Sequence, residues 1–379
     1  MGEAVCKPEI KSTKASERNI SLDILRILCM FLIILCHSIC HGTVIEALDV
    51  GSANYYIITT VNTFLMVHVN CFVLISGYFL CKQEFHLKKA LMLWAQTFFW
   101  SVVIYLISCA FGQTAFSVKE LVKALLPFTQ QRYWFVTTYL LMYFLVPLLN
   151  AAIHAMDRKQ HATFLMIYFI VYTVLQNLVF WREYTAVNSR SPLFFAFLYL
   201  IAAYFRLYPV KKRKWLVWYI FFCGFVTIWK ILISAITTPI FGEAIGETAF
   251  SSYNSVTMVL AAVCLFKAFQ ETKVSVGRLA KVITLISSVT FGVYLIHDNS
   301  ECRAFLWKTL LCPERFAENP VLLLILLAMS IGVFTCCGIL EYGRQLVFRF
   351  LRIDVIVSFV SEKIEKMVRW MTKKLLDVE

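Results

Sequence analysis

An apolar run over residues 22–41, LDILRILCMFLIILCHSICH, restricts what this chain can fold into more than any other part of the sequence. At a rise of about 1.5 Å per residue, about 20 residues are enough to cross the hydrocarbon core of a bilayer as a helix. At about 100° per residue, Arg26 and His37 return to nearly the same side of that helix. Asp23 lies one turn earlier and His41 one turn later on this side. Because such side chains are costly in lipid unless they face protein or water, the run predicts a membrane helix whose polar stripe points into a bundle.

The rest of the chain repeats this kind of apolar run. Of its 379 residues, 60% are hydrophobic and 16% are charged, which is typical of a polytopic membrane protein and not of a soluble domain. Ten runs can be distinguished, and they cover residues 22–41, 55–80, 91–112, 133–153, 162–181, 192–208, 215–238, 254–266, 282–298 and 320–340. The sequence therefore predicts an all-α fold, a polytopic transmembrane bundle with one helix for each run.

The net charge of +13 is distributed unevenly among the connections. Together with Arg206 at the end of the sixth run, the N-terminal segment, the connections after the second, fourth, sixth and eighth runs, and the C-terminal tail contain 26 of the 36 Lys and Arg residues. Positively charged connections stay on the cytoplasmic side of a membrane, where they also meet anionic lipid headgroups. We therefore expect both termini to be cytoplasmic, in a multi-pass protein of the cytoplasmic membrane. The basic surplus needs no nucleic acid partner to explain it.

Three regions follow from this pattern. Residues 1–20 are polar and contain several lysines, and we expect a cytoplasmic N-terminal lead-in. Residues 21–343 form the predicted transmembrane domain. Residues 344–379 alternate apolar with basic positions, which predicts a basic amphipathic helix that lies on the cytoplasmic leaflet.

Most of the 13 cysteines lie inside the apolar runs, where they are best interpreted as small hydrophobic residues. No CxxC pair and no histidine pair beside one occurs, so the sequence predicts no metal site. Cys302 and Cys312 are a candidate disulfide pair if their loop faces an oxidising compartment, and this alternative stays open.

His37 is the best candidate for chemistry in the first run. A neutral imidazole in a partly dry pocket is a competent general base or nucleophile near neutral pH. A single buried histidine is more often a satisfied polar residue than a catalyst, but three neighbours favour a functional role. They are His41 one turn on, Arg26 three turns below on the same face, and His297 at a similar depth in the run 282–298.

Two further groups of residues have both a functional and a structural interpretation. Ser76 and Gly77 lie near the cytoplasmic end of the second run, where small residues also allow two helices to pack closely. Arg132, Tyr133 and Trp134 begin the fourth run, where they form either a lip that binds sugars or part of an aromatic interface belt.

Four segments resemble, in chain order, sequence blocks of the acyltransferase 3 family of integral membrane acyltransferases. They are LDILRILCMFLIILCHS, NCFVLISGYFL, YWFVTTYLLMYFLVPLLN and FGVYLIH. Arg26 and His37 match the arginine and histidine of the family's first helix in identity and spacing. The resemblance implies an O-acyltransferase of a bacterial cell envelope that moves an acyl group, commonly acetyl, from cytoplasmic acyl-CoA to a hydroxyl of a cell-surface or exported saccharide. It implies no permanently bound cofactor, and it leaves the oligomeric state open.

The resemblance also implies roles for individual residues. Arg26, oriented by Asp23 through a charge-assisted hydrogen bond, would hold the phosphate or pantetheine end of acetyl-CoA. His37 would meet the thioester or the acceptor hydroxyl, either as the base for direct transfer or as a transient acyl-imidazole. The other residues expected on the donor side are Ser76, Gly77 and Tyr78. The residues expected on the acceptor side are His41, Asn70, Arg132, Tyr133, Trp134 and His297.

A transporter is the competing function class, because a bundle with an inward polar stripe can also export a polysaccharide or a lipid-linked sugar. Many transporters are built from inverted repeats with glycine- or proline-broken helices at matching positions. The sequence shows neither feature. It therefore favours the enzyme.

Overall fold

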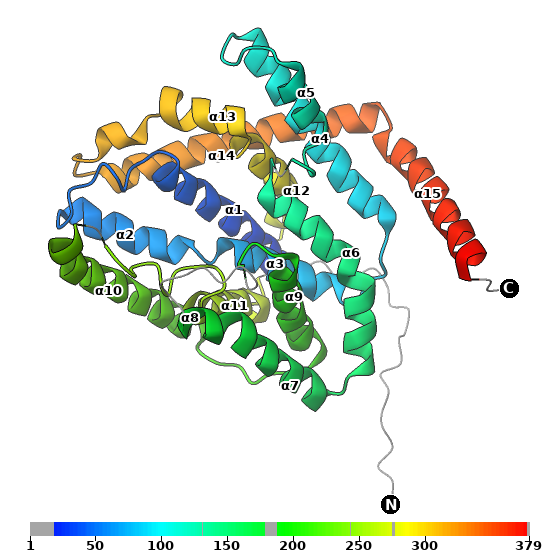
Figure 1. The fold of residues 1–379 in the computed structure, drawn as a ribbon, viewed down its shortest axis with the longest axis horizontal. Helices are drawn as coiled ribbons and strands as arrows, with labels where there is room; N and C mark the ends of the chain where they lie inside the picture. The colour runs from blue at the N-terminus through cyan, green and yellow to red at the C-terminus, as the bar shows by residue number, and fades with distance from the viewer. Residues whose placement is uncertain (1–18, 131, 179–187, 243, 275–276, 377–379) are drawn as a thin grey trace, which may run out of the picture.

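The computed structural model describes residues 19–130, 132–178, 188–242, 244–274 and 277–376, and it is built from helices (Figure 1). None of these described residues belongs to a β-strand. The all-α fold predicted from the apolar runs is therefore confirmed.

Helix α1 (Ile20–Cys40) lies at the centre of the bundle and packs against α2, α3, α11, α12 and α14. It begins at Asn19, whose side chain caps the helix by accepting a hydrogen bond from the backbone N–H of Leu22. The other α-helices are α2 (Ala53–Leu65), α3 (His68–Leu80), α4 (Leu87–Ala110), α5 (Val118–Leu125), α6 (Trp134–Ala155), α7 (Arg158–Phe169), α8 (Leu175–Leu178), α9 (Pro192–Leu207), α10 (Trp215–Phe241), α11 (Val256–Glu271), α12 (Leu279–His297), α13 (Ser300–Phe305), α14 (Leu322–Phe350) and α15 (Ile353–Leu376). Short π-helical turns follow α7 (η1, Ile170–Val174) and α13 (η3, Leu306–Leu310), and a 3₁₀ turn (η4, Pro313–Phe316) precedes α14.

Seven helical stretches in the described part of the chain are long and apolar enough to cross a membrane. They are Ile20–Cys40, Ala53–Leu80, Leu87–Ala110, Trp134–Ala155, Trp215–Phe241, Leu279–His297 and Leu322–Phe350. The other predicted runs correspond to α7 with its π turn and α8, to α9, and to α11. At 16 residues each, α9 and α11 cover only about 24 Å of a hydrocarbon core of about 30 Å. The multi-pass membrane protein is confirmed, whereas ten crossings and the cytoplasmic location of both termini stay predictions.

The second apolar run does not form one continuous helix. It is interrupted at Met66 and Val67, between α2 and α3, near the middle of the stretch Ala53–Leu80. The interruption places the N-terminal end of a helix near the middle of this apolar stretch, with His68 as its first residue.

Gly77 lets α3 and α9 pack closely together. A Cβ atom at this position would lie 2.8 Å from the Cα atom and 2.9 Å from the carbonyl oxygen of Tyr199. Side chains cannot be accommodated at such a helix contact, which is why small residues are favoured there. The structural interpretation of this glycine is thus supported by the fold.

A buried carboxylate joins α4, α12 and α14. Glu341 is fully buried and accepts hydrogen bonds from Trp100 Nε1 at 2.8 Å, from Gln96 Nε2 at 3.1 Å and from the guanidinium of Arg344 at 2.6 to 3.1 Å. Gly292 of α12 makes room for it, because a Cβ atom there would lie 2.1 Å from the Glu341 Cδ atom. A buried charge is tolerated when it is paired and its hydrogen-bonding capacity is used, and this carboxylate meets both conditions.

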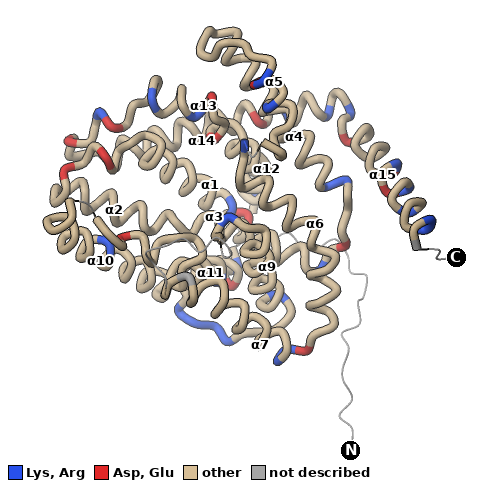
Figure 2. The backbone as a smooth tube through the Cα atoms, in the orientation of Figure 1, with Lys and Arg blue, Asp and Glu red and all other residues tan. Residues whose placement is uncertain are grey.

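The C-terminal tail begins later than its charge pattern predicts. Helix α14 continues to Phe350. Arg344, the first basic residue of that pattern, lies inside this helix and is buried against Glu341. A separate helix, α15, begins at Ile353 and packs against α4 and α14. Figure 2 shows its Lys and Arg residues from the middle of the helix to its C-terminal end. Of the predicted lead-in, residues 1–18 lie outside the described part of the chain.

Candidate active site

A cavity of about 360 Å³ opens beside the C-terminal half of α1. Its inner part is apolar and is lined by Met30, Ile33, Phe72, Phe135 and Phe291. Its other end is polar and is lined by His37, His41, His68, Tyr294, Asp298 and Arg303. A largely apolar pocket with a few convergent polar groups is the usual form of a small-molecule site.

His37, which lines this cavity, contacts His297 of α12, which is buried behind the cavity wall. The His37 Nδ1 atom lies 3.1 Å from the His297 Nε2 atom. His297 is fully buried, and its Nδ1 atom lies 2.7 Å from the backbone carbonyl oxygen of Val293, one turn earlier in α12. A carbonyl oxygen only accepts hydrogen bonds, so the proton of a neutral His297 is on Nδ1.

This contact fixes the tautomer of His37. With its proton on Nδ1, His297 accepts a hydrogen bond at Nε2, and His37 must donate it from Nδ1. The lone pair of the neutral His37 ring is then on Nε2. We assign this arrangement from the hydrogen-bond network, and it leaves a basic nitrogen for a reacting group.

Asp298 supplies negative charge next to both histidines of α1. Its Oδ1 atom lies 3.6 Å from His37 Nδ1 and 3.8 Å from His41 Nε2. Arg303 holds the carboxylate in place with a hydrogen bond of 3.2 Å. Burial and the nearby Arg303 lower the pKa of His41, which follows the last residue of α1. A neutral His41 leaves the Asp298 charge available to a protonated His37.

Aromatic rings form one wall of the mouth of the cavity. The rings of Trp134 and Tyr253 are stacked, with centroids 6.2 Å apart and an interplanar angle of 22°. The exposed Arg190 lies with its guanidinium 5.1 Å from the centroid of the Trp134 ring. Trp134 therefore lines the same cavity as His37, and its role in acceptor binding stays a prediction.

Arg26 and Asp23 form a separate cluster nearer the start of α1. Arg26 Nη1 donates to Asp23 Oδ1 at 3.0 Å and to Ser287 Oγ of α12 at 3.2 Å. Ser287 also donates to Asp23 Oδ1, at 2.9 Å. The predicted pairing of Arg26 with Asp23 is therefore present. Arg26 does not line the cavity, which ends one helical turn away at Met30.

The predicted donor-side residues of α3 lie in two different environments. Ser76 donates to the carbonyl of Phe72 in its own helix, and Gly77 is occupied by the contact with α9. Tyr78 accepts a hydrogen bond of 2.6 Å from Arg206, whose guanidinium also lies 4.4 Å from the centroid of its ring. Tyr78 is thus the one residue of the three whose side chain is paired with a cation.

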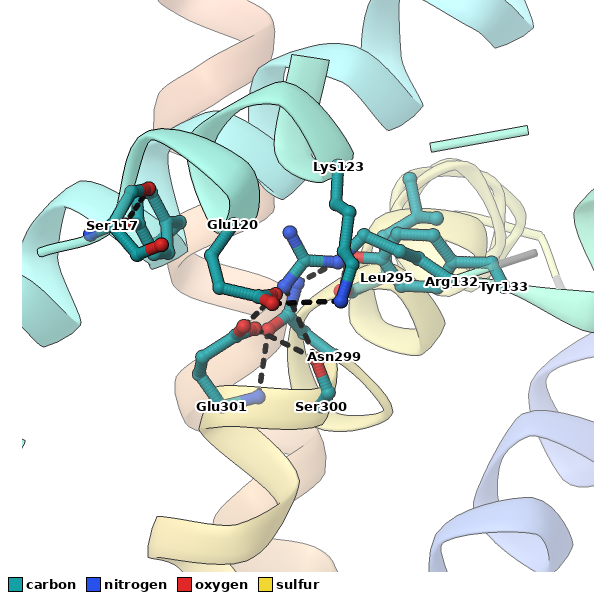
Figure 3. A network of polar contacts seen from close by, with 10 residues as sticks. Ser117, Glu120, Lys123, Arg132, Tyr133, Leu295, Asn299, Ser300 and Glu301 are labelled. Atoms are coloured by element: carbon teal, nitrogen blue, oxygen red, sulfur yellow. Dashed lines mark hydrogen bonds and ion pairs between the residues drawn. The ribbon is translucent and has the colours of Figure 1, made fainter. Parts of the chain in front are cut away.

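Arg132 and Tyr133 are engaged in contacts among helix ends and do not line the cavity (Figure 3). Arg132 is paired with Glu301 and donates to Ser300 at 3.1 Å. The Tyr133 hydroxyl donates to the carbonyl of Leu295 at 2.9 Å and accepts a hydrogen bond from Asn299 at 2.7 Å. These contacts hold the start of α6 against the end of α12, and so they position Trp134.

The amide group of Asn70 also makes a structural hydrogen bond. Its Nδ2 atom donates to the carbonyl of Tyr253 at 2.8 Å. This bond fixes the segment that carries the Tyr253 ring, so Asn70 contributes to the cavity through another residue.

His37, His41 and Asp298 have the composition of a metal site, although the sequence predicts none. One ligand atom from each of them lies within 4.8 Å of the others. In the structure His37 is bonded to His297 and Asp298 to Arg303, while His41 Nε2 lies 3.8 Å from Asp298 Oδ1. Cys302 and Cys312, the other pair left open by the sequence, are both free thiols.

Sequence reasoning missed several cavity residues. They are His68 at a helix interruption, Arg190 and Tyr253 in connections, and Arg303 in the short helix α13. No periodic pattern links these positions to the stripe on α1. For His68 a signal was present, since a histidine in the middle of an apolar run needs a polar environment.

The fold and the cavity define a multi-pass membrane protein with a histidine site between its first helix and α12. The family model described as an acyltransferase domain matches residues 19–341, and the chain therefore belongs to the acyltransferase 3 family. No curated protein and no solved structure matches the chain. It is accordingly a membrane acyltransferase, and the matched region contains both the cavity and the Arg26 cluster.

Proposed function

We propose that the protein transfers an acyl group, commonly acetyl, from cytoplasmic acyl-CoA to a hydroxyl of an extracytoplasmic saccharide. The observation that carries this proposal is the His37–His297 hydrogen bond, which leaves the Nε2 atom of the cavity-lining His37 unprotonated. A general base needs such a lone pair within reach of the hydroxyl that it activates.

Direct transfer is the mechanism that this arrangement favours. The acceptor hydroxyl gives its proton to His37 Nε2 as its oxygen bonds to the acyl carbon. The imidazolium that forms has the Asp298 carboxylate 3.6 Å from its other nitrogen, and opposite charges at this distance stabilise each other. When the carbon–sulfur bond breaks, His37 returns the proton to the CoA thiolate.

The acceptor would bind at the mouth of the cavity. Trp134 and Tyr253 provide flat apolar faces, and Arg190 provides hydrogen-bond donors above one of them. Aromatic faces together with planar donors suit a sugar ring, which has apolar C–H faces and polar edges. The positive-inside pattern of the connections supports an extracytoplasmic location for this end of α1.

The donor would approach from the opposite end of α1, where Arg26, Asp23 and Ser287 are bonded together. Arg26 and His37 are eleven residues apart, a separation of about 16 Å along the helix. An extended chain such as the pantetheine arm of CoA suits that separation. The apolar part of the cavity, between Met30 and His37, would accommodate the acyl chain.

Replacing His37 tests the proposal in cells that make the protein. His37→Gln should lower ester-linked acyl groups on the surface glycan by about 100-fold or more, because a positioned general base contributes about 10² to 10⁴ in rate. Mass spectrometry of the glycan measures this, with the amount of protein in the membrane measured alongside. The matched control is His154→Gln, at an exposed histidine of α6, which should leave acylation unchanged.

The same glycan measurement, extended to a strain without the gene, distinguishes an enzyme from an exporter. Wild-type acylation in the His37→Gln strain, with the protein present in the membrane, would refute the proposal. A strain without the gene should still export the glycan, without its acyl groups. Disappearance of the glycan itself would favour export.

A further inference from the structure

His68 is a buried histidine that has no role in the proposed reaction as described above. Its exposed fraction is 2%, and neither ring nitrogen has a hydrogen-bond partner among the described residues. It lines the same cavity as His37, and its ring packs edge-on against Tyr253 with centroids 5.7 Å apart. Burying a polar group without a partner is costly, so such a group in a cavity indicates a ligand that completes it.

The position of His68 in its helix adds a second observation. It is the first residue of α3, which begins near the middle of the apolar stretch Ala53–Leu80, after the interruption at Met66 and Val67. The first N–H groups of a helix have no partner in a preceding turn, and they give this end of the helix a partial positive charge. Val67, at the capping position, makes no side-chain hydrogen bond to them. Both the ring and the helix end therefore favour a ligand that carries negative charge.

We propose that His68 donates its ring N–H to the acyl carbonyl oxygen of the donor, and that α3 begins where it does in order to stabilise the oxyanion. This inference rests on the proposed function, because only acyl transfer produces such an oxyanion here. A neutral imidazole always carries one N–H, so a donor is present in either tautomer.

Charge moves toward His68 during the reaction. As the acceptor oxygen bonds to the acyl carbon and its proton passes to His37 Nε2, the carbonyl π electrons move onto the carbonyl oxygen. His68 and the N-terminal end of α3 stabilise that oxygen. When the electrons return and the carbonyl forms again, the carbon–sulfur bond breaks, and the thiolate leaves with the proton from His37. Donors placed where charge develops stabilise the transition state more than the ground state.

The test compares two variants of His68 in the purified full-length protein, with acetyl-CoA as donor and, as acceptor, glycan extracted from a strain without the gene. His68→Leu removes the N–H, whereas His68→Gln keeps an N–H donor of similar reach. Since one oxyanion donor is worth about 10² to 10³ in kcat, His68→Leu should lower kcat at least about 100-fold, with KM for acetyl-CoA within about threefold of wild type. His68→Gln should retain most of kcat.

His161 provides the matched control. It is also fully buried, but it packs between Tyr204 and Tyr208 and does not line the cavity. His161→Leu should leave kcat and KM unchanged. If His68→Leu does not reach the membrane, His68→Met, which also lacks an N–H, takes its place.

Three results would overturn the inference. One is a kcat for His68→Leu close to that of wild type, another is an equal loss of kcat in folded His68→Gln, and the third is a loss confined to KM. An inactive His37→Gln alongside an active His68→Leu would remove only the role of His68. Full activity of His37→Gln would remove the proposed function itself.

Discussion

The basicity of His37 depends on a residue that touches no substrate in the proposed reaction. His297 sets the tautomer of His37. Its Nδ1 atom donates a hydrogen bond to the backbone carbonyl of Val293, so its Nε2 atom accepts the hydrogen bond that His37 donates from Nδ1. Asp298 then lies close to the nitrogen of His37 that keeps its proton. In the proposed reaction His297 is therefore a positioning residue, and His37 is the base.

Removal of His297 should leave His37 without its acceptor. In His297→Ala both tautomers of His37 become accessible, and we expect kcat to fall by about 10² to 10⁴, since loss of the group that orients a catalytic histidine has effects up to this size. The pH dependence of kcat should also shift, which a loss of packing alone would not cause. His297→Gln, whose side-chain oxygen can accept the hydrogen bond from His37, should recover part of the rate.

A steady-state pH profile of the three proteins provides the measurement. Equal rates and identical profiles for wild type and His297→Ala would contradict the assigned tautomer. Failure of His297→Gln to recover any rate, with the protein folded, would show that acceptance of the hydrogen bond is not what His37 requires.

At the residue scale, the sequence predicted the members of the α1 stripe but not all of their partners. The helical period placed Arg26 with Asp23 and His37 with His41, and the similar depth of His297 in the run 282–298 placed it near His37. Ser287 and Arg303 were not predictable in these roles, because they become neighbours of the stripe only through the packing of α12 and its following segment on α1. Arg132 was predicted to face an acceptor, yet its pairing with Glu301 depends on two helix ends meeting in space.

At the scale of elements, the interruption between α2 and α3 has the largest consequence. No glycine or proline occurs at Met66 or Val67, so composition gave no reason to divide the run 55–80. The division brings the start of α3 to the cavity. The sequence also did not predict that α15 begins at Ile353, because it does not show that Arg344 is paired inside α14.

The contact between α12 and α14 can be tested through its glycines. Gly292→Ala places a Cβ atom 2.1 Å from a carboxylate that is held by several hydrogen bonds, so that neither side can move freely. Overpacking of this kind destabilises a protein by about 1 to 3 kcal/mol, and we expect a lower melting temperature in detergent. Gly338→Ala is the control, because its Cβ atom would lie 3.7 Å from Val289, an ordinary contact in the same helix pair.

Thermal unfolding of the two variants and of wild type measures the difference. The account requires Gly292→Ala to melt below Gly338→Ala. Equal melting temperatures would mean that Glu341 does not occupy the space beside Gly292.

At the scale of the whole molecule, composition and the apolar runs were sufficient to predict a multi-pass helical membrane protein, and four short segments were sufficient for its family. The number of crossings did not follow as directly. An apolar run of 16 residues can lie buried inside a bundle without spanning the bilayer, and α9 and α11 have this length. Hydropathy measures burial, whether the surroundings are lipid or protein.

The proposed reaction also requires an arrangement that no single helix provides. The cavity with His37 lies toward one end of α1, the cluster of Arg26, Asp23 and Ser287 lies toward the other, and the basic residues of α15 belong to the predicted cytoplasmic side (Figure 2). Donor and acceptor would therefore reach α1 from opposite sides of the membrane.

Transfer across a closed membrane tests this central claim most directly. Inverted membrane vesicles that contain the protein would receive acetyl-CoA labelled in its acyl group at the cytoplasmic face, with glycan acceptor enclosed in the lumen. We predict label on the enclosed glycan with wild-type protein and none above background with His37→Gln. Equal labelling with both proteins, or labelling only when donor and acceptor share one side, would contradict the account.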